Sequence, residues 1–315
     1  MLIPPAIFLG LGVGLWVWKC TMLVVFQNKI IYMPAFPPSS RRDKISDYEK
    51  RCGGVKWREI RLKSLDGVRL AACLAKTEGK KRTQENVEAP VYVLYFQGNC
   101  SSTPPRLPLI SPIVKLLNDD ECRYVFLCLS YRGYWMSQGW PNEIGITKDA
   151  LAALRWIAAQ HSDTKSTIPV VVWGQSIGCG IASTLLANHD QSCSNLSIEA
   201  LVLEAPFTNV RDMLKAIYPQ RWLPYQYLWP FLRNQLDSVA ALEKIAEKQK
   251  RPRITLVVAG EDELVPLDHS LQLQKRGREL GLIIERVVIA NSLHEQVLDK
   301  VAGRAAITNS IRSSS

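Results

Sequence analysis

Short apolar runs alternate along the chain with segments of helical length. The apolar runs cover residues 91–96, 124–129, 170–173 and 200–203, and turn-forming residues bound each of them. Such runs are typical of strands that are buried on both faces of a parallel sheet. The segments expected to be helical are 109–117, which contains Pro112, 147–160, which has Asp149 in its first turn, and 177–188. Strands that alternate with helices predict right-handed βαβ units around one sheet.

The pattern on both sides of this region extends the sheet. Residues 55–63 alternate in polarity, and Asp66-Gly67 then turns into 68–74, which predicts an antiparallel hairpin at a sheet edge. Further strands are expected at 254–258 and 282–289, with a helix at 267–280 between them and a final helix after His294. The predicted fold is therefore α/β, with a mostly parallel sheet of about eight strands and helices on both faces.

Residues 206–251 interrupt this alternation and are rich in proline and aromatic residues. The aromatic side chains that fall close together are Trp222, Tyr225, Tyr227, Trp229 and Phe231. We interpret the interval as an inserted lid, and the alternative is a packed helical excursion without substrate contact. The remaining boundaries that we predict are a Pro-rich linker over 28–54, the α/β domain over 55–305 and a disordered tail over 306–315.

The N-terminal segment 2–26 is apolar apart from Lys19, Cys20 and Thr21. A membrane-spanning helix needs about 20 apolar residues, and the segment is long enough if Lys19 reaches the interface or faces protein. The favoured interpretation is an uncleaved anchor over residues 1–27, with a signal peptide or an interfacial hairpin as alternatives. Basic residues follow the segment and none precedes it, so the positive-inside tendency predicts a single-pass anchor with the α/β domain in the cytoplasm.

The formal charge of +10 suits an anionic surface such as phospholipid or nucleic acid. The basic residues are scattered in short clusters, and the sequence has neither a recognition helix nor zinc-finger spacing, so nucleic-acid binding is not expected. A basic cluster at residues 41–44 follows the predicted anchor. Each such residue contributes about 1 kcal/mol of attraction to an anionic leaflet, which favours the membrane as the partner.

Eight cysteines are spread along the chain without CxxC pairs, so neither a zinc site nor a disulfide framework is indicated. Cys128 and Cys179 fall in apolar stretches and are expected to be buried free thiols, which favours a reducing compartment. Two Asn-x-Ser matches, at Asn99 and Asn195, would matter only in a luminal domain.

The segment Gly174-Gln175-Ser176-Ile177-Gly178 joins an apolar strand to a helix. Strand, sharp turn and helix form the setting of a nucleophile elbow. The turn holds the serine in a strained backbone conformation, and small residues two positions before and after it avoid clashes with the neighbouring strand and helix. We therefore predict that Ser176 is a nucleophile.

A serine hydroxyl is a poor nucleophile unless a base lies within hydrogen-bond reach. His161 and His189 lie at helix ends on the wrong edge of the predicted sheet, and His269 lies in the first turn of a helix. His294 follows the last strand and reaches the edge at which Ser176 stands. His294 is therefore the predicted general base.

A carboxylate from another strand end is expected to orient the histidine and to stabilise its protonated form. Asp262 closely follows the strand at 254–258, and Glu261 and Glu263 are the neighbouring alternatives. The order serine, acid, histidine is the one found in α/β hydrolases. Acyl transfer also requires donors for the oxyanion. The N–H of Ile177 is one candidate, and the loop 97–100 is expected to supply the other.

Five segments resemble the Bem-type eukaryotic α/β hydrolases, relatives of membrane-associated depalmitoylases, and the resemblance runs from about Asn28 to Val297. They read YFQGN, YRGYWMSQGWP with Asp149 following, GQSIG, EDELVP and SLHEQV. The predicted triad, aromatic lid and anchor favour a lipid-like or acylated substrate. The resemblance implies hydrolysis of an ester or thioester, without metal or organic cofactor. It also implies that Asn99 supplies the second backbone donor and that the loop 131–134 gives structural support.

One position departs from the family pattern. The loop usually carries histidine before Gly-Asn, and this sequence has Gln97. A non-catalytic scaffold that keeps the fold for partner binding is therefore an alternative to an enzyme. A serine peptidase is a second alternative, since the same three side chains can cleave amides.

Overall fold

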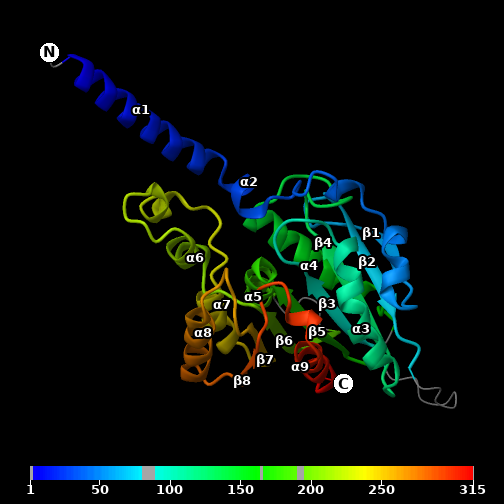
Figure 1. Cartoon of the computed structure of the whole chain (residues 1–315). Helices are drawn as coiled ribbons and strands as arrows, with labels where there is room; N and C mark the ends of the chain where they lie inside the picture. The colour runs from blue at the N-terminus through cyan, green and yellow to red at the C-terminus, as the bar shows by residue number, and fades with distance from the viewer. Residues whose placement is uncertain (1–2, 80–88, 164–165, 190–194, 315) are drawn as a thin grey trace.

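One sheet of eight strands forms the centre of the computed structural model, which describes residues 3–79, 89–163, 166–189 and 195–314 (Figure 1). The strand order is β1-β2-β4-β3-β5-β6-β7-β8. β2 runs antiparallel to both of its neighbours, and the other pairs are parallel. The strands are β1 Arg58–Lys63, β2 Arg69–Lys76, β3 Val91–Phe96, β4 Tyr124–Ser130, β5 Ile168–Gln175, β6 Leu196–Glu204, β7 Arg253–Ala259 and β8 Ile284–Ile289. The predicted α/β fold is confirmed.

Helices cover both faces of the sheet. Side chains of α4, α5, α7 and α8 share one buried cluster with the sheet, and side chains of α3 and α9 share the other. Successive residues of β3 alternate between the two clusters, as the period of a strand requires. The helices from α3 onward are α3 Leu107–Asn118, α4 Glu143–Ala159, α5 Ile177–Asn188, α6 Val210–Ile217, α7 Ser238–Ala246, α8 Leu267–Glu279 and α9 Val301–Arg312.

The end of the chain is helical, so the prediction of a disordered tail over 306–315 is wrong for most of that range. α9 continues to Arg312, and Ile307 and Ile311 are fully buried against the sheet. These two side chains lie one helical turn apart and therefore share one face. Arg312 also pairs with Asp120, with Nε 2.8 Å from Oδ2. The serine-rich composition of the last residues concealed this short apolar stripe.

The interval interpreted as a lid is shorter than 206–251. Within it, α7 belongs to the core, since Leu242 and Ile245 are buried in the cluster that α5 and α8 share. Residues 206–237 remain outside the sheet and contain α6 and two 3-10 turns, Pro224–Gln226 and Trp229–Phe231. We call residues 206–237 the insert.

The helix α1, Ile3–Val25, projects away from the body, and the insert lies beside its inner end (Figure 1). Within the described residues, it is the one helix that is long and apolar enough to cross a membrane, over Pro5–Val25. A short helix, α2, follows at Gln27–Tyr32. The predicted linker 28–54 is packed rather than free, since Tyr32 and Cys52 are buried.

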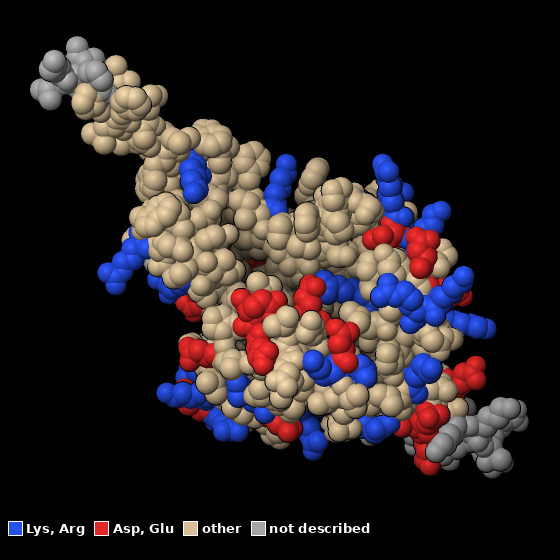
Figure 2. Space-filling model, in the orientation of Figure 1, with Lys and Arg blue, Asp and Glu red and all other residues tan. Residues whose placement is uncertain are grey.

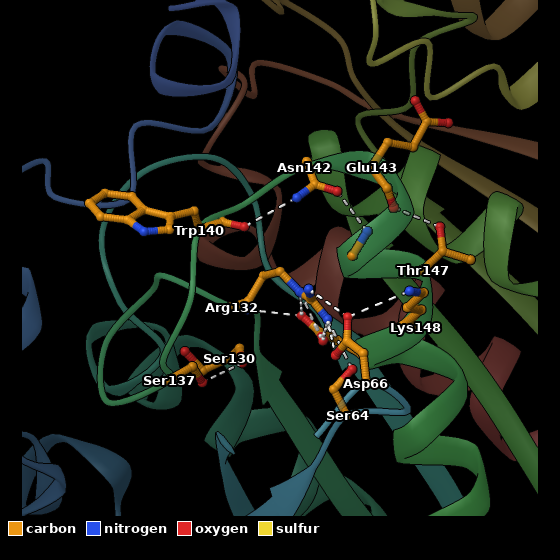
Figure 3. A network of polar contacts seen from close by, with 12 residues as sticks. Ser64, Asp66, Ser130, Arg132, Ser137, Trp140, Asn142, Glu143, Thr147 and Lys148 are labelled. Carbon is orange, nitrogen blue, oxygen red and sulfur yellow. Dashed lines mark hydrogen bonds and ion pairs between the residues drawn. The ribbon is translucent and has the colours of Figure 1, made fainter. Parts of the chain in front are cut away.

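A buried ion-pair network joins the β1–β2 turn to the start of α4 (Figure 3). Nη2 of Arg132 lies 2.7 Å from Oδ1 of Asp149 and 2.9 Å from Oδ1 of Asp66. Asp149 is fully buried, and it lies in the second turn of α4 rather than the first, because the helix begins at Glu143. Asn142 caps this helix by accepting from the N–H of Gly145 at 2.8 Å.

Candidate active site

Ser176 lies at the point where the strand order reverses, directly after β5 and beside the loop that follows β3. Its backbone has φ 52° and ψ −118°, which is a strained conformation for a residue with a side chain. A Cβ on Gly174 would lie 2.3 Å from the carbonyl oxygen of Gly178, and a Cβ on Gly178 would lie 2.2 Å from that of Phe96. The two glycines therefore permit the tight turn that exposes the serine.

His294 lies between Ser176 and Asp262. Its Nε2 is 2.9 Å from Oγ of Ser176, and its Nδ1 is 2.8 Å and 3.0 Å from the two carboxylate oxygens of Asp262. The side chains of His294 and Asp262 are 6% and 2% exposed. The contact between these two side chains is thus shielded from water, and this strengthens it electrostatically.

The geometry distinguishes among the three adjacent acids that the sequence left open. The carboxylate of Asp262 faces the imidazole and also accepts the N–H of Val265 at 2.7 Å. The Glu263 carboxylate instead accepts the backbone N–H of His294 at 2.9 Å, while Glu261 is exposed. Glu263 therefore holds the loop that carries the histidine, and Asp262 contacts the ring.

The other histidines have partners elsewhere in the fold. His161 contacts the hydroxyl of Tyr92 at 2.9 Å, and His269 contacts Oγ1 of Thr208 at 2.8 Å. His189 forms the C-cap of α5. The structure therefore brings the predicted nucleophile, base and acid together. Within the described residues, no group of three or more His, Cys, Asp or Glu side chains is arranged to hold a metal ion.

A cavity of about 520 Å³ opens beside Ser176 and His294. Part of its wall comes from the segment that the sequence suggested was a linker, through Met33, Phe36 and Pro37. The carbonyl of Phe36 accepts the N–H of Ser101 at 2.5 Å, which ties this segment to the loop after β3. The other residues found to line the cavity come from the ends of the strands, the loops that follow them and the first turn of α3, and the insert contributes none of them.

The loop after β3 packs closely against the serine. A Cβ on Gly98 would lie 3.6 Å from Cβ of Ser176. Gln97, which departs from the family pattern, is fully buried and accepts from Oγ1 of Thr103 at 2.9 Å through its side-chain oxygen. Its carbonyl accepts the hydroxyl of Tyr131 at 2.7 Å. The glutamine therefore supports the loop from beneath, and Tyr131 has the structural role that the resemblance implied.

Comparison with known proteins agrees with this fold. A family model of the alpha/beta hydrolase fold matches residues 93–242. WAV2, an alpha/beta hydrolase domain-containing protein of Arabidopsis thaliana, is 32% identical over 277 residues, which cover 85% of this chain and 80% of that protein. Protein bem46 of Schizosaccharomyces pombe is 29% identical over 245 residues, covering 78% of this chain and 72% of that protein.

The chain belongs to the Bem46-like α/β-hydrolase family. The lysophosphatidylserine lipase ABHD12 of Macaca fascicularis is also similar, with 35% identity over 126 residues that cover 39% of this chain and 29% of that protein. A solved α/β hydrolase from Vibrio vulnificus has the same fold, with a TM-score of 0.67, 17% identity and coverage of 91% of both chains. The family and these relatives support a hydrolase.

Sequence reasoning missed a buried polar network beneath the serine of this Bem46-like hydrolase. The Glu204 carboxylate ends β6, is fully buried, and accepts from Nε1 of Trp173 and Nε2 of Gln175, both at 3.1 Å. The side-chain oxygen of Gln175 in turn accepts from Arg106 at 3.2 Å. Arg106 also donates to the carbonyl of Asn99 at 3.3 Å, so the network reaches the loop beside the serine. An acid directly after the apolar run 200–203 was the available signal.

Burial raises the pKa of the Glu204 carboxyl to about 7 from a reference value of 4.5. A carboxyl with a raised pKa holds its proton longer in the folded state than in the unfolded state, so its stabilising contribution is complete below pH 4.5 and is lost as the pH rises through 7. In the wild type, we expect the free energy of unfolding to fall by on the order of 3 kcal/mol across this window. In Glu204→Gln, this fall should be absent.

Urea unfolding in detergent at several pH values between 4.5 and 8 measures this change. Glu285→Gln, which removes an exposed carboxyl from an edge strand, provides the control. Parallel curves for wild type and Glu204→Gln would show that the buried carboxyl does not titrate in this range.

Proposed function

We propose that this chain is a membrane-anchored serine hydrolase that cleaves carboxylic esters or thioesters through an acyl-serine intermediate. The observation that carries the proposal is the continuous line of contacts from Oγ of Ser176 through the imidazole of His294 to the Asp262 carboxylate. A serine with a histidine in hydrogen-bond reach and an acid behind it is the arrangement that activates a hydroxyl.

In the proposed mechanism, Nε2 of His294 takes the proton of Ser176 while Oγ attacks the substrate carbonyl carbon. Asp262 accepts from Nδ1–H, which fixes the tautomer and stabilises the imidazolium that forms. The tetrahedral intermediate collapses, and His294 donates the proton to the departing alcohol or thiol. Water then attacks the acyl-serine with the same histidine as base, and this releases the acid and regenerates Ser176.

Backbone donors beside Ser176 stabilise the oxyanion in this proposal. Ile177 is the first residue of α5, so its N–H is among those that the helix leaves without an internal acceptor. Asn99 is proposed to supply the second N–H. Its side chain is held in place, since Nδ2 donates to the carbonyl of Ile31 at 2.7 Å and Oδ1 accepts from Cys100 N–H at 2.8 Å. Each oxyanion donor contributes about 3 to 4 kcal/mol.

A lipid-like or acylated substrate fits the surroundings of the serine. Apolar side chains that line the cavity, among them Met33, Phe36 and Leu109, suit an acyl chain. The wall that carries Met33 and Phe36 continues from α1, which we propose crosses the membrane once with the body on the cytoplasmic side. ABHD12, the similar protein described above, is named a lysophosphatidylserine lipase, and this supports a lipid ester as the substrate class.

A fluorophosphonate probe tests the proposed function. We expect the probe to label the wild-type chain on Ser176, detected as a mass increase of the peptide that contains it, and to leave Ser176→Ala unlabelled. The exposed Ser46 provides a matched control, because Ser46→Ala removes a surface hydroxyl and should label like wild type. A folded wild-type chain that neither reacts with the probe nor hydrolyses p-nitrophenyl esters would instead indicate a non-catalytic scaffold.

A further inference from the structure

The base of the insert is hydrogen-bonded to the inner end of α1. The guanidinium of Arg233 donates to the carbonyls of Val24 and Val25 at 3.0 Å and 3.3 Å. The side chain of Gln27 donates to the carbonyl of Phe231 at 3.0 Å and accepts the N–H of Arg233 at 2.7 Å. Because these contacts use the last carbonyls of α1, they fix the insert at the level where the apolar helix ends.

The insert also extends along α1 itself. Nζ of Lys19 lies 5.6 Å from the centre of the Tyr225 ring. Lys19 precedes Val25 by six residues, which corresponds to about 9 Å along a helix. A small apolar cavity of about 70 Å³ lies between the two elements and is lined by side chains that include Leu23 and Leu228. The insert therefore runs beside roughly the last two turns of the helix that we propose crosses the membrane.

The outer surface of the insert is apolar and aromatic. Its exposed large hydrophobic side chains are Ile217, Trp222, Tyr227, Trp229 and Phe231. Trp222 is 75% exposed, and Phe231 is 60% exposed. Figure 2 shows a largely uncharged surface over α1 and the neighbouring insert, whereas most acidic side chains on this face lie over the body. Aromatic side chains of this kind are enriched where proteins meet the membrane–water interface.

The charges of the insert suit an anionic headgroup layer. Four basic residues, Arg211, Lys215, Arg221 and Arg233, accompany two acidic residues, Asp212 and Asp237. The guanidinium of Arg211 stacks over Trp229 at 3.9 Å, so a basic group and an aromatic group are presented together. Amphipathic elements with basic and aromatic side chains bind in the plane of a bilayer, with their apolar face about 5–10 Å below the headgroups.

We propose that the insert is a second membrane-binding element, immersed in the lipid interface beside α1, with Trp222, Trp229 and Phe231 at the boundary between headgroups and acyl chains. The proposal rests on α1 crossing the membrane, which is part of the proposed function. A lipid bilayer is the expected partner because the insert runs beside about the last 9 Å of the apolar helix. This length matches the depth at which interfacial elements lie below the headgroups. Such a position also brings the bilayer close to the cavity wall at Met33 and Phe36.

Quenching by brominated lipid tests the position of the insert independently of catalysis. The full-length chain is reconstituted into vesicles of phosphatidylcholine and phosphatidylserine, with or without lipid that carries bromine in its acyl chains. We expect Trp222→Phe and Trp229→Phe each to lower the amount of tryptophan fluorescence that bromine quenches. Trp156→Phe removes a half-buried tryptophan on the last part of α4 and is expected to leave the quenched amount unchanged.

A quenched amount that is unchanged in both insert variants would overturn the proposal. The fluorescence of Trp222 and Trp229 could instead respond to the protein-to-lipid ratio but not to bromine. This result would also overturn the proposal, since a second copy of the chain would then cover the surface. Quenching is independent of turnover. A failure of probe labelling would contradict the proposed chemistry, whereas the quenching result would still test the position of the insert.

A charge placed on the insert tests its effect on substrate access. We expect the double variant Trp222→Glu and Phe231→Glu to reduce hydrolysis of an acyl ester in vesicles by about tenfold, which corresponds to about 1.4 kcal/mol. Hydrolysis of a short, water-soluble ester should be unchanged. Ile283→Glu is the control, because Ile283 is 71% exposed and precedes β8 at the opposite edge of the sheet from Ser176. Equal loss on both substrates would contradict the proposal.

Discussion

Replacement of His294 by alanine is expected to lower kcat for ester hydrolysis by about 10⁵- to 10⁶-fold, because Ser176 then has no base within reach of its hydroxyl. Asp262→Asn is expected to cost about 10⁴-fold, since an amide at this position can donate to Nδ1 and favour the wrong tautomer. The side chains of both residues are buried, and their contacts lie at 2.8 to 3.0 Å. Single-turnover kinetics with a p-nitrophenyl ester measures the loss in the acylation step.

The neighbouring acids provide the control for this prediction. Glu261→Gln removes a carboxylate from an exposed side chain in the same loop and is expected to change kcat only slightly. The triple variant of Ser176, His294 and Asp262 is expected to be about as slow as His294→Ala alone, because residues that act as a unit are not additive. Comparable losses in Glu261→Gln and Asp262→Asn would show that the contact with the imidazole is not what orients the base.

The Asp149→Asn variant is expected to show the largest loss of stability, about 3–5 kcal/mol. It removes one charge of a buried pair and leaves the guanidinium of Arg132 without its closest partner. Asp66 remains as a second partner, and hydrogen bonds from Arg132 hold the pKa of Asp66 down at about 2. That pair is partly exposed, with 30% of the Asp66 side chain accessible, so Asp66→Asn is expected to cost less than Asp149→Asn.

Urea unfolding in detergent measures these differences, and an exposed ion pair supplies the comparison. Arg276 and Glu243 lie 2.5 Å apart, with side chains that are 39% and 44% exposed. Arg276→Leu is expected to leave the free energy of unfolding nearly unchanged, because solvent screens this exposed pair. If Asp149→Asn were as mild as Arg276→Leu, the buried network would not be what holds the β1–β2 turn against α4.

Much of the fold could be predicted from the sequence because its elements have local signatures. The apolar run 91–96 and the helix 177–188 were located without error, since turn residues bound the first and the Ser176 elbow begins the second. Helix starts were less accurate. The predicted start of α4 at Thr147 lies four residues after the true one, since its N-cap, Asn142, follows a proline-containing loop that reads as irregular.

The candidate site could be predicted in part. Ser176 and His294 were identifiable because each follows a strand and carries a distinctive side chain, and the topology then brings them together across 118 residues. The choice among three adjacent acids depends on how one loop turns, which residue type does not encode. Arg106 and Glu204 were missed for a related reason. Their partners lie far apart along the chain, so no periodic pattern marks them.

The wall formed by residues 33–37 means that the proposed membrane anchor cannot be exchanged freely. Asn99 and Ser101 donate hydrogen bonds to the backbone carbonyls of Ile31 and Phe36. The segment that follows α1 therefore also supports the loop beside Ser176. A version without its N-terminal 54 residues would lose part of the cavity wall beside Ser176 together with the proposed anchor. The outer turns of α1 can therefore vary far more easily than residues 26–37, which follow it.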